Sequence, residues 1–263
     1  DQFGKALPVQ VSHRFAVSSA VFDDEHLVSC AGLVPVMALA EQCGLSMLLS
    51  QKVRFACERI RSGGANPVPK LMTVIAGMCA GADSIDNLDV VRSGGMKTLF
   101  DGVYAPSTIG TLLREFTFGH TRQLDGVLRG HLVALCGRVD LLPGAQERAF
   151  IDIDSLLRPV YGHAKQGACY GHTKIAGKQV LRKGLSPLVT TISTDHSAPV
   201  IAGARLRAGK ANSGKGAASM ITEAVATARA AGVTGQILVR GDSAYGTGTV
   251  VNAAREAGAR FSV

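Results

Sequence analysis

The chain has 263 residues, 46% of them hydrophobic, and carries a net charge of +8 at pH 7. This length and composition are enough to bury one large core or two modest ones, and they exclude an intrinsically disordered chain. No run approaches the roughly 18 apolar residues that a membrane span needs, and no basic-then-apolar leader precedes residue 20. We therefore expect a cytoplasmic protein without a membrane partner, whose six cysteines, none in a CxxC pair, are reduced and bind no zinc.

The first half of the chain is predicted to be helical. Apolar residues recur at helical spacing in three stretches, 31–49, 70–81 and 112–135. Residues 105–115 have the composition of a helix start with Ser107 as its N-cap, and such a helix either reads DNA or packs in the core. Residues 137–148 form the most natural boundary. We therefore expect residues 1–148 to be a helical region that is a candidate for DNA binding.

The second half of the chain changes to the period of β-strands. Strands are predicted at residues 149–154, 185–194, 199–206, 237–239 and 260–263. Helices are predicted at residues 217–231 and 248–257. Three strands followed by alternating helix and strand predict a mixed β-sheet flanked by helices. The expected fold class is therefore α+β or α/β, with the sheet domain in residues 149–263.

The positive charge is concentrated in the second half. Residues 149–263 hold 14 basic residues against 6 acidic ones, whereas residues 1–148 hold 14 of each. Residues 158–215 contain a block of ten basic residues and a single acidic residue, Asp195. Such a block favours a polyanion such as DNA, although a solvated basic surface would have the same composition. The residues predicted to contact DNA are Lys174, Lys178, Arg182, Lys183, Arg205, Arg207, Lys210, Lys215 and Arg240.

Two aspartates follow short β-like runs and are the candidate catalytic residues. Asp154 ends the run Phe-Ile-Asp-Ile-Asp, and Asp242 follows Ile-Leu-Val-Arg-Gly. Carboxylates held on adjacent strands form the minimal site for divalent ions that cleave phosphodiesters. Asp152 shares a strand face with Asp154 because side chains alternate along a strand, so periodicity leaves both open as the first acid.

Four segments resemble landmarks of a known family. Residues 151–162, 184–189, 206–213 and 238–245 are similar to successive motifs of bacterial insertion-sequence transposases of the DDE, RNase H-like superfamily, of the actinobacterial type. The resemblance covers residues 149–263 well and is looser before them. It implies an RNase H-like catalytic domain, with Asp154 as the first acid and Asp242 as the second, both acting as metal ligands.

The resemblance also implies an activity and its partners. Such enzymes use Mg²⁺, with Mn²⁺ as an alternative, to cut DNA at the ends of an insertion sequence and to transfer the freed strand to target DNA. They bind the terminal repeats and the target, and we expect a homo-oligomer when the enzyme is active. Aspartate oxygens are the ligands that Mg²⁺ prefers.

One departure from the family pattern concerns the third carboxylate. The resemblance implies a Glu on a helix well after the fifth strand, whereas the sequence given ends at Val263, inside that strand. Glu223 and Glu256 both lie elsewhere in the predicted order. We therefore expect a portion of a longer enzyme, incomplete at the C-terminus of its sheet domain and inactive by itself.

A competing prediction comes from residues 209–216. Their sequence, Gly-Lys-Ala-Asn-Ser-Gly-Lys-Gly, nearly satisfies the phosphate-binding loop GxxxxGK[ST] between a predicted strand and a predicted helix. The final hydroxyl residue is replaced by Gly216. A nucleotide hydrolase is therefore one alternative, and a DNA-binding protein without catalytic activity is another.

Overall fold

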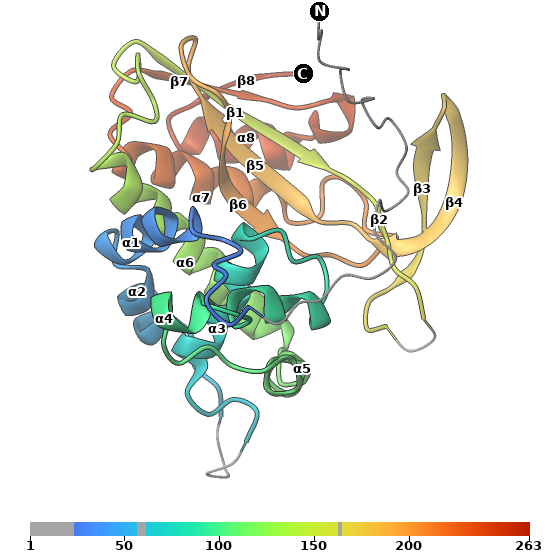
Figure 1. Cartoon of the computed structure of the whole chain (residues 1–263). Coiled ribbons are helices and arrows are strands. Elements are labelled where there is room, and N and C mark those ends of the chain that lie inside the picture. Colours follow the sequence, from blue (N-terminus) through green and yellow to red (C-terminus); the bar gives the residue numbers. More distant parts are fainter. Residues whose placement is uncertain (1–23, 57–61, 163–164) are drawn as a thin grey trace, which may run out of the picture.

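The computed structural model describes residues 24–56, 62–162 and 165–263. Helices occupy the first half and β-strands with two helices the second, as Figure 1 shows. The elements of the first half are α1 (Leu33–Gln42), α2 (Leu45–Lys52), α3 (Pro67–Cys79), the 3₁₀ helix η1 (Asp86–Val91), α4 (Met96–Leu99), α5 (Pro106–Arg114) and α6 (Phe118–Cys136). The helical character predicted for the described part of this half is confirmed.

Two of the predicted long helices are each divided. Gly44 adopts a left-handed conformation (φ 71°) that ends α1 and starts α2, so the stretch 31–49 holds two helices. The stretch 112–135 is divided at Thr117, whose hydroxyl pairs with the third residue of α6 while the His120 ring accepts from the Thr117 N–H (2.9 Å). Local capping chemistry thus prevails over the longer apolar pattern.

The N-cap predicted for helix α5 is wrong by two positions. Helix α5 begins at Pro106, with Ala105 in the cap position, and Ser107 lies inside the first turn. Proline suits the first helical position because its fixed φ fits the helix and its missing N–H has no partner there anyway. The proline signal therefore outweighs the serine signal.

The second half forms a mixed five-stranded sheet. Its strands are β1 (Arg148–Ser155), β5 (Leu188–Ser193), β6 (Val200–Arg205), β7 (Gln236–Arg240) and β8 (Arg260–Ser262). They lie in the order β6-β5-β1-β7-β8; β5 runs antiparallel to its neighbours β1 and β6, and β7 and β8 run parallel to β1. All five predicted strands are confirmed, and this order is consistent with an RNase H-like domain.

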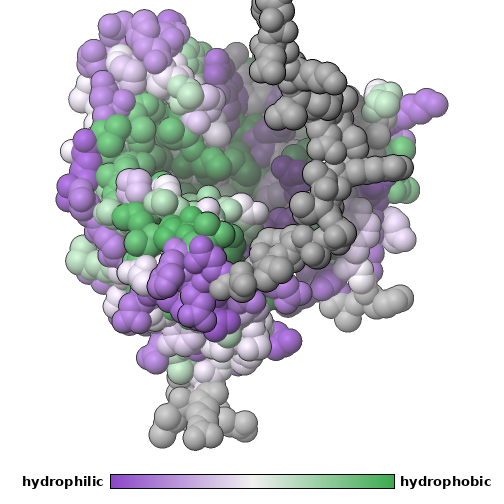
Figure 2. All heavy atoms as spheres, viewed as in Figure 1, coloured by the Kyte–Doolittle hydropathy of each residue, from purple (hydrophilic) through white to green (hydrophobic). Residues whose placement is uncertain are grey.

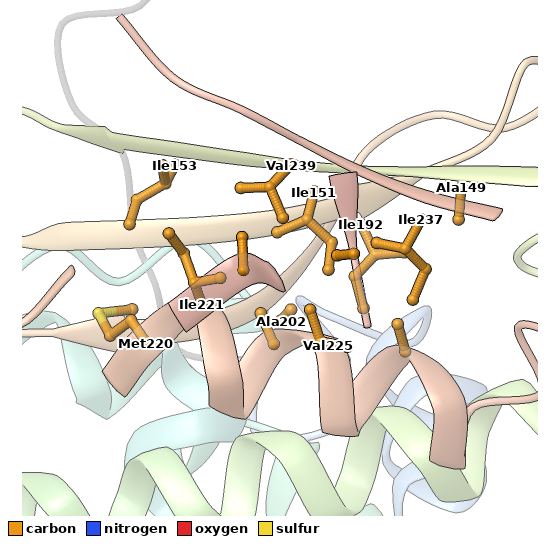
Figure 3. Packing of buried hydrophobic residues seen from close by; sticks show 14 of the residues in the cluster. Ala149, Ile151, Ile153, Ile192, Ala202, Met220, Ile221, Val225, Ile237 and Val239 are labelled. Carbon is orange, nitrogen blue, oxygen red and sulfur yellow. The ribbon is translucent and has the colours of Figure 1, made fainter. Parts of the chain in front are cut away.

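One face of the sheet is covered by α7 (Ala217–Ala230) and α8 (Gly248–Glu256). Alternate residues of β1, such as Ile151 and Ile153, point into this layer, and Figure 3 shows them above Ile221 and Val225 of α7. Each such side chain contributes about 1.5–3 kcal/mol when it is fully buried. The opposite alternation places Asp152 and Asp154 away from this core.

A second, smaller sheet was not predicted. Strands β2 (Arg158–Pro159), β3 (Cys169–Ile175) and β4 (Lys178–Leu185) form an antiparallel sheet in the order β2-β4-β3. In Figure 1 the β3–β4 hairpin projects at the right, beyond the end of β1. The basic block of the sequence is therefore built partly on a hairpin arm.

Helix α6 joins the helical region to the sheet. It packs against β6 and α7, and its Leu132 belongs to the same core cluster as Ile151. The buried Asp125 of α6 accepts from the Ala204 N–H of β6 (3.1 Å), which fixes the helix against the strand. The helical region is thus anchored to the sheet by apolar and polar contacts.

The molecular surface differs between the two halves. Figure 2 shows hydrophobic atoms gathered on the left half of the drawn face and mostly hydrophilic atoms toward the hairpin on the right. Among the described residues no single helix has the length and apolar composition to cross a membrane. Helices α1 and α2, bent by 57° to each other, meet that test only as a pair.

Candidate active site

Two adjacent parallel strands place Asp154 and Asp242 at one edge of the sheet. In the pairing of β1 with β7, Asp152 lies opposite Arg240. Asp154 and Asp242 each follow two residues later, at the carboxyl ends of the two strands. Both residues are exposed. The structure thus brings together the two predicted acids, which are 88 residues apart in the sequence.

Each of these carboxylates is oriented by backbone N–H groups. The Ser155 N–H donates to Asp154 Oδ1 (2.6 Å), and the Ala244 N–H donates to Asp242 Oδ1 (3.0 Å). The second contact caps the short 3₁₀ helix η2 (Ser243–Tyr245). Within the described residues neither carboxylate forms an ion pair, so their remaining oxygens are available to a cation.

Asp152 has a different environment from Asp154. Arg240 donates from Nε to Asp152 Oδ1 (2.6 Å) and from Nη2 to Oδ2 (2.8 Å), while its guanidinium lies 4.3 Å from the Phe150 ring centroid. The hydrogen bonds to Asp152 raise the pKa of Arg240. This bidentate pair neutralises Asp152 and favours Asp154 as the first acid. The prediction that Arg240 contacts DNA now carries a condition, because a phosphate would have to compete with Asp152 for the guanidinium.

A buried tyrosine lies beneath the two acids. Tyr245 is fully buried, and its hydroxyl has no partner of good hydrogen-bond geometry in the described part of the chain. Burial raises the pKa of Tyr245, and the charges of Asp154 and Asp242 raise it further, whereas Ser155 and Arg207 oppose this. The hydroxyl therefore lies within electrostatic range of both carboxylates. The sequence analysis did not single out Tyr245. The 3₁₀ turn η2, directly after Asp242, brings this residue into the protein interior next to the site.

The predicted DNA-binding residues divide into an exposed and a buried set. Lys178, Arg182, Lys210 and Lys215 are exposed, and Lys183 is half-buried. The backbone of Lys174 lies in β3, but its side chain lies outside the described parts of the structure. The exposed set lies on the β3–β4 hairpin and on the loop between β6 and α7. These two segments are therefore the parts of the basic block that can meet a polyanion.

Arg205 and Arg207 are corrections to that prediction. Arg205 retains an exposed side-chain fraction of 11%, and its Nη2 donates to Glu223 (3.1 Å). Arg207 is buried, and its guanidinium donates to the carbonyl oxygens of four residues, Ser186, Asn212, Ser213 and Lys215 (3.0–3.1 Å). Both guanidinium groups stabilise the fold. Neither presents a free cation to DNA.

The two alternative third acids lie away from the pair. Glu223 on α7 forms ion pairs with Arg122 (2.8 Å), Arg129 and Arg205. Glu256 ends α8, a helix that begins after the Asp242 edge and leads back to the start of β8, at the opposite edge of the sheet. Among the described residues no group of three or more His, Cys, Asp or Glu side chains is placed to hold a metal ion.

The loop that resembles a phosphate-binding loop has a different structure. It follows β6, an antiparallel edge strand, and precedes α7. Its carbonyl oxygens bind Arg207, and the Lys215 N–H donates to the Asn212 carbonyl (3.2 Å) and side chain (2.9 Å). A phosphate-binding loop instead directs free N–H groups at the ligand. This arrangement argues against the nucleotide hydrolase.

A cleft of about 690 Å³ opens beside the two acids. Ser155, Ala244 and Thr247 line the end nearest the acids, and the β3–β4 hairpin and the loop 209–214 form most of the remaining walls, together with Leu157 and Ser186. The exposed Lys210 lies on this wall. The cleft therefore connects the candidate catalytic edge with the exposed part of the basic block.

The sequence matches a family model that covers nearly the whole chain. The model describes the transposase DDE domain, group 1, and matches residues 13–263. Comparison with curated proteins and with solved structures returns no significant match. The matched region contains both strand-end acids, the cleft beside them and the helical region. The chain therefore belongs to the DDE transposase family.

Proposed function

We propose that this protein supplies the first two metal-binding acids, Asp154 and Asp242, of an insertion-sequence transposase that cuts and rejoins DNA. The family implies transposition-related nuclease activity on DNA. The observation that carries the proposal is the pair of exposed carboxylates at the ends of two adjacent parallel strands, which have no ion-pair partner among the described residues. The neighbouring Asp152 is already neutralised by Arg240 and serves as an internal contrast.

The donor set fits a hard divalent cation. Carboxylate oxygens suit Mg²⁺, or Mn²⁺ in its place, and DDE transposases generally use divalent metal ions. When bound, such ions lower the pKa of a water and neutralise charge on the phosphate. Asp154 and Asp242 would hold the ions. Two carboxylates supply fewer ligands than a pair of ions requires, so the third acid has to come from outside the described residues.

The remaining parts of the site position DNA. Hydrolysis forms a bond between the water oxygen and phosphorus and breaks the P–O3′ bond, which releases a 3′ hydroxyl. Attack by that hydroxyl on a target phosphate forms a new P–O3′ bond and breaks the P–O3′ bond of the target, which leaves with a free 3′ hydroxyl. The N–H groups of Ser155 and Ala244 orient the two acids toward the phosphate. The exposed basic residues of the hairpin and of the loop 209–215 hold the flanking backbone.

The proposal extends to the organisation of the whole protein. Residues 149–263 form the RNase H-like catalytic domain, and residues 1–148, helical in their described parts, are a candidate for DNA binding. The terminal repeats and the target are the DNA partners, the active form is a homo-oligomer, and the enzyme acts in the bacterial cytoplasm. The order of the five strands supports the assignment of the catalytic domain, and α6 connects the helical region to it through a shared core.

The test compares three aspartate variants of the complete element-encoded polypeptide. Asp154→Asn and Asp242→Asn should each reduce Mg²⁺-dependent nicking of element-end DNA by at least about 10³-fold, because each removes a metal ligand. Asp152→Asn is the matched control, and it should retain nicking within about tenfold. Melting temperatures in EDTA should change little in all three. Nicking that survives Asp154→Asn but disappears with Asp152→Asn would overturn the assignment.

A further inference from the structure

One face of the β3–β4 hairpin presents large apolar side chains to the cleft. In the hairpin register His172 lies opposite Leu181, and Tyr170 lies opposite Lys183 on the same face. Tyr170 and Leu181 retain exposed fractions of 67% and 59%. Tyr170, His172 and Leu181 all line the cleft. An aromatic ring and an aliphatic side chain thus form an open platform beside the candidate catalytic edge.

The platform is fixed relative to the site by a close backbone crossing. A Cβ on Gly171 would lie 2.2 Å from the Gly209 carbonyl oxygen, and one on Gly209 would lie 2.3 Å from the Gly184 carbonyl oxygen. The Lys210 N–H also donates to Cys169 Sγ (3.1 Å). Only glycine allows three backbone segments to approach so closely. The base of the hairpin is therefore locked onto the loop that forms the other wall of the cleft.

The cleft has the size and chemistry for a single strand. Its volume of about 690 Å³ lies in the range of roughly 300–1,000 Å³ that holds small ligands, which suits one or two nucleotides but not a duplex. No carboxylate is among its described lining residues, whereas Lys210, Asn212 and Ser213 offer a cation and polar groups. The exposed Lys178 and Arg182 lie on the same hairpin. The charge of the cleft therefore complements a DNA backbone.

We infer that this cleft binds an unpaired segment of DNA next to the scissile phosphate, with one base stacked on Tyr170. Proteins that hold single strands combine a basic groove with aromatic platforms in this way. The inference rests on the proposed function, since Asp154 and Asp242 mark the position of the phosphate. It adds that the strand beside the phosphate leaves the duplex and enters the cleft.

The test measures binding of a single-stranded oligothymidylate of about eight nucleotides, and of a duplex of equal length, to the 263-residue chain in EDTA. Tyr170→Ala should weaken single-strand binding about tenfold, since stacking one base accounts for roughly a 5- to 150-fold change, and should change duplex binding less than twofold. Tyr170→Phe keeps the ring and should bind like the wild type. Tyr161→Ala removes another exposed tyrosine, with an exposed fraction of 81%, that does not line the cleft, and should change neither affinity.

Tyrosine emission supplies a second readout, because the chain contains four tyrosines and no tryptophan. Quenching by the single strand should be largely lost in Tyr170→Phe and retained in Tyr161→Phe. Wild-type single-strand affinity in Tyr170→Ala, or an equal loss in Tyr161→Ala, would overturn the inference. These measurements need no metal and no cleavage. A result against stacking therefore leaves the assignment of the two aspartates intact. Conversely, nicking activity in the Asp154→Asn variant would contradict that assignment but would not change the measured single-strand binding.

Discussion

Asp152 and Asp154 show that the surroundings of a carboxylate, more than its residue type, determine its role. Both lie on the same face of β1, two residues apart. Arg240 on the adjacent strand lies opposite Asp152 and forms a bidentate pair with it. Asp154 lies two residues beyond the last residue pair of the two strands. The alternation of side chains alone leaves the two equivalent. Their difference arises from a strand that is distant in the sequence.

Glu223 shows the same principle inside the fold, and its charge should stabilise the protein. Burial raises the pKa of Glu223, but the hydrogen bond from Arg122 and the charges of Arg129, Arg122 and Arg205 outweigh this, so the pKa lies below its ordinary value of 4.5. A depressed folded-state pKa means that the stabilisation is present above about pH 4.5 and is lost as the pH falls through the folded-state pKa.

We expect Glu223→Gln to lower the free energy of unfolding by about 2 kcal/mol at pH 7, because Arg205 loses its ion pair and Arg122 and Arg129 keep only Asp125. The difference between wild type and variant should shrink as the pH falls below about 4.5. Urea unfolding at pH 7 and at a series of acidic pH values measures both effects. Asp195→Asn, which breaks an exposed pair with Arg148, is the control and should cost less than about 1 kcal/mol. Equal costs for the two variants would contradict the cluster's role.

At the scale of elements, the apolar pattern predicted the five strands of the main sheet well. Strands β1, β5 and β7 bury alternate residues in the main core, and that burial leaves a clear signal in the sequence. The β3–β4 hairpin buries little and carries charged or polar residues on both faces, so it has no apolar alternation to detect. Its Gly171 and Gly184 are the one signal present, but their role depends on the distant Gly209.

The glycine crossing leads to a prediction about the hairpin as a unit. Gly171→Ala places a Cβ against the Gly209 carbonyl oxygen and should destabilise the hairpin by about 1–3 kcal/mol, as overpacking typically does. Amide hydrogen exchange of β3 and β4 should accelerate by about tenfold, while exchange in β1, β5 and β7 stays unchanged. Gly214→Ala is the matched control, because a Cβ there meets nothing within 4 Å. Unchanged exchange in the Gly171 variant would show that the crossing does not hold the hairpin.

At the scale of the whole molecule, fewer basic side chains are available to DNA than the net charge of +8 suggests. The sequence predicted one basic block, but Arg205 and Arg207 are used inside the fold and Arg240 is paired on the sheet. Burial and pairing depend on the tertiary structure, so composition cannot separate these residues from the exposed lysines. The placement of the two candidate acids at strand ends, by contrast, was predictable, because each lies in the sequence directly beside the apolar run that forms its strand.

The exposed part of the block should set the salt dependence of DNA binding. Lys210 and Lys215 are both exposed on the loop before α7. Each phosphate contact adds about 0.9 to the slope of log affinity against log salt, so replacing both lysines by alanine should flatten the slope by up to about two units. Duplex binding of the 263-residue chain at several salt concentrations measures this slope. The control replaces Arg255 and Arg260, which are exposed outside the basic block and the helical region, and an equal flattening there would show that the basic block has no special role.

The pairing of β1 with β7 also has a consequence for how the enzyme is made. Asp152 and Arg240, and with them the two acids that follow, are separated by 88 residues in the chain but meet on adjacent strands. Contacts of such long range form late in folding, since the intervening chain must first be ordered. During synthesis the ribosome has to release β7 and the turn after it before the two candidate acids can meet. The end of the sheet that carries both candidate acids can therefore form only after translation has passed Asp242.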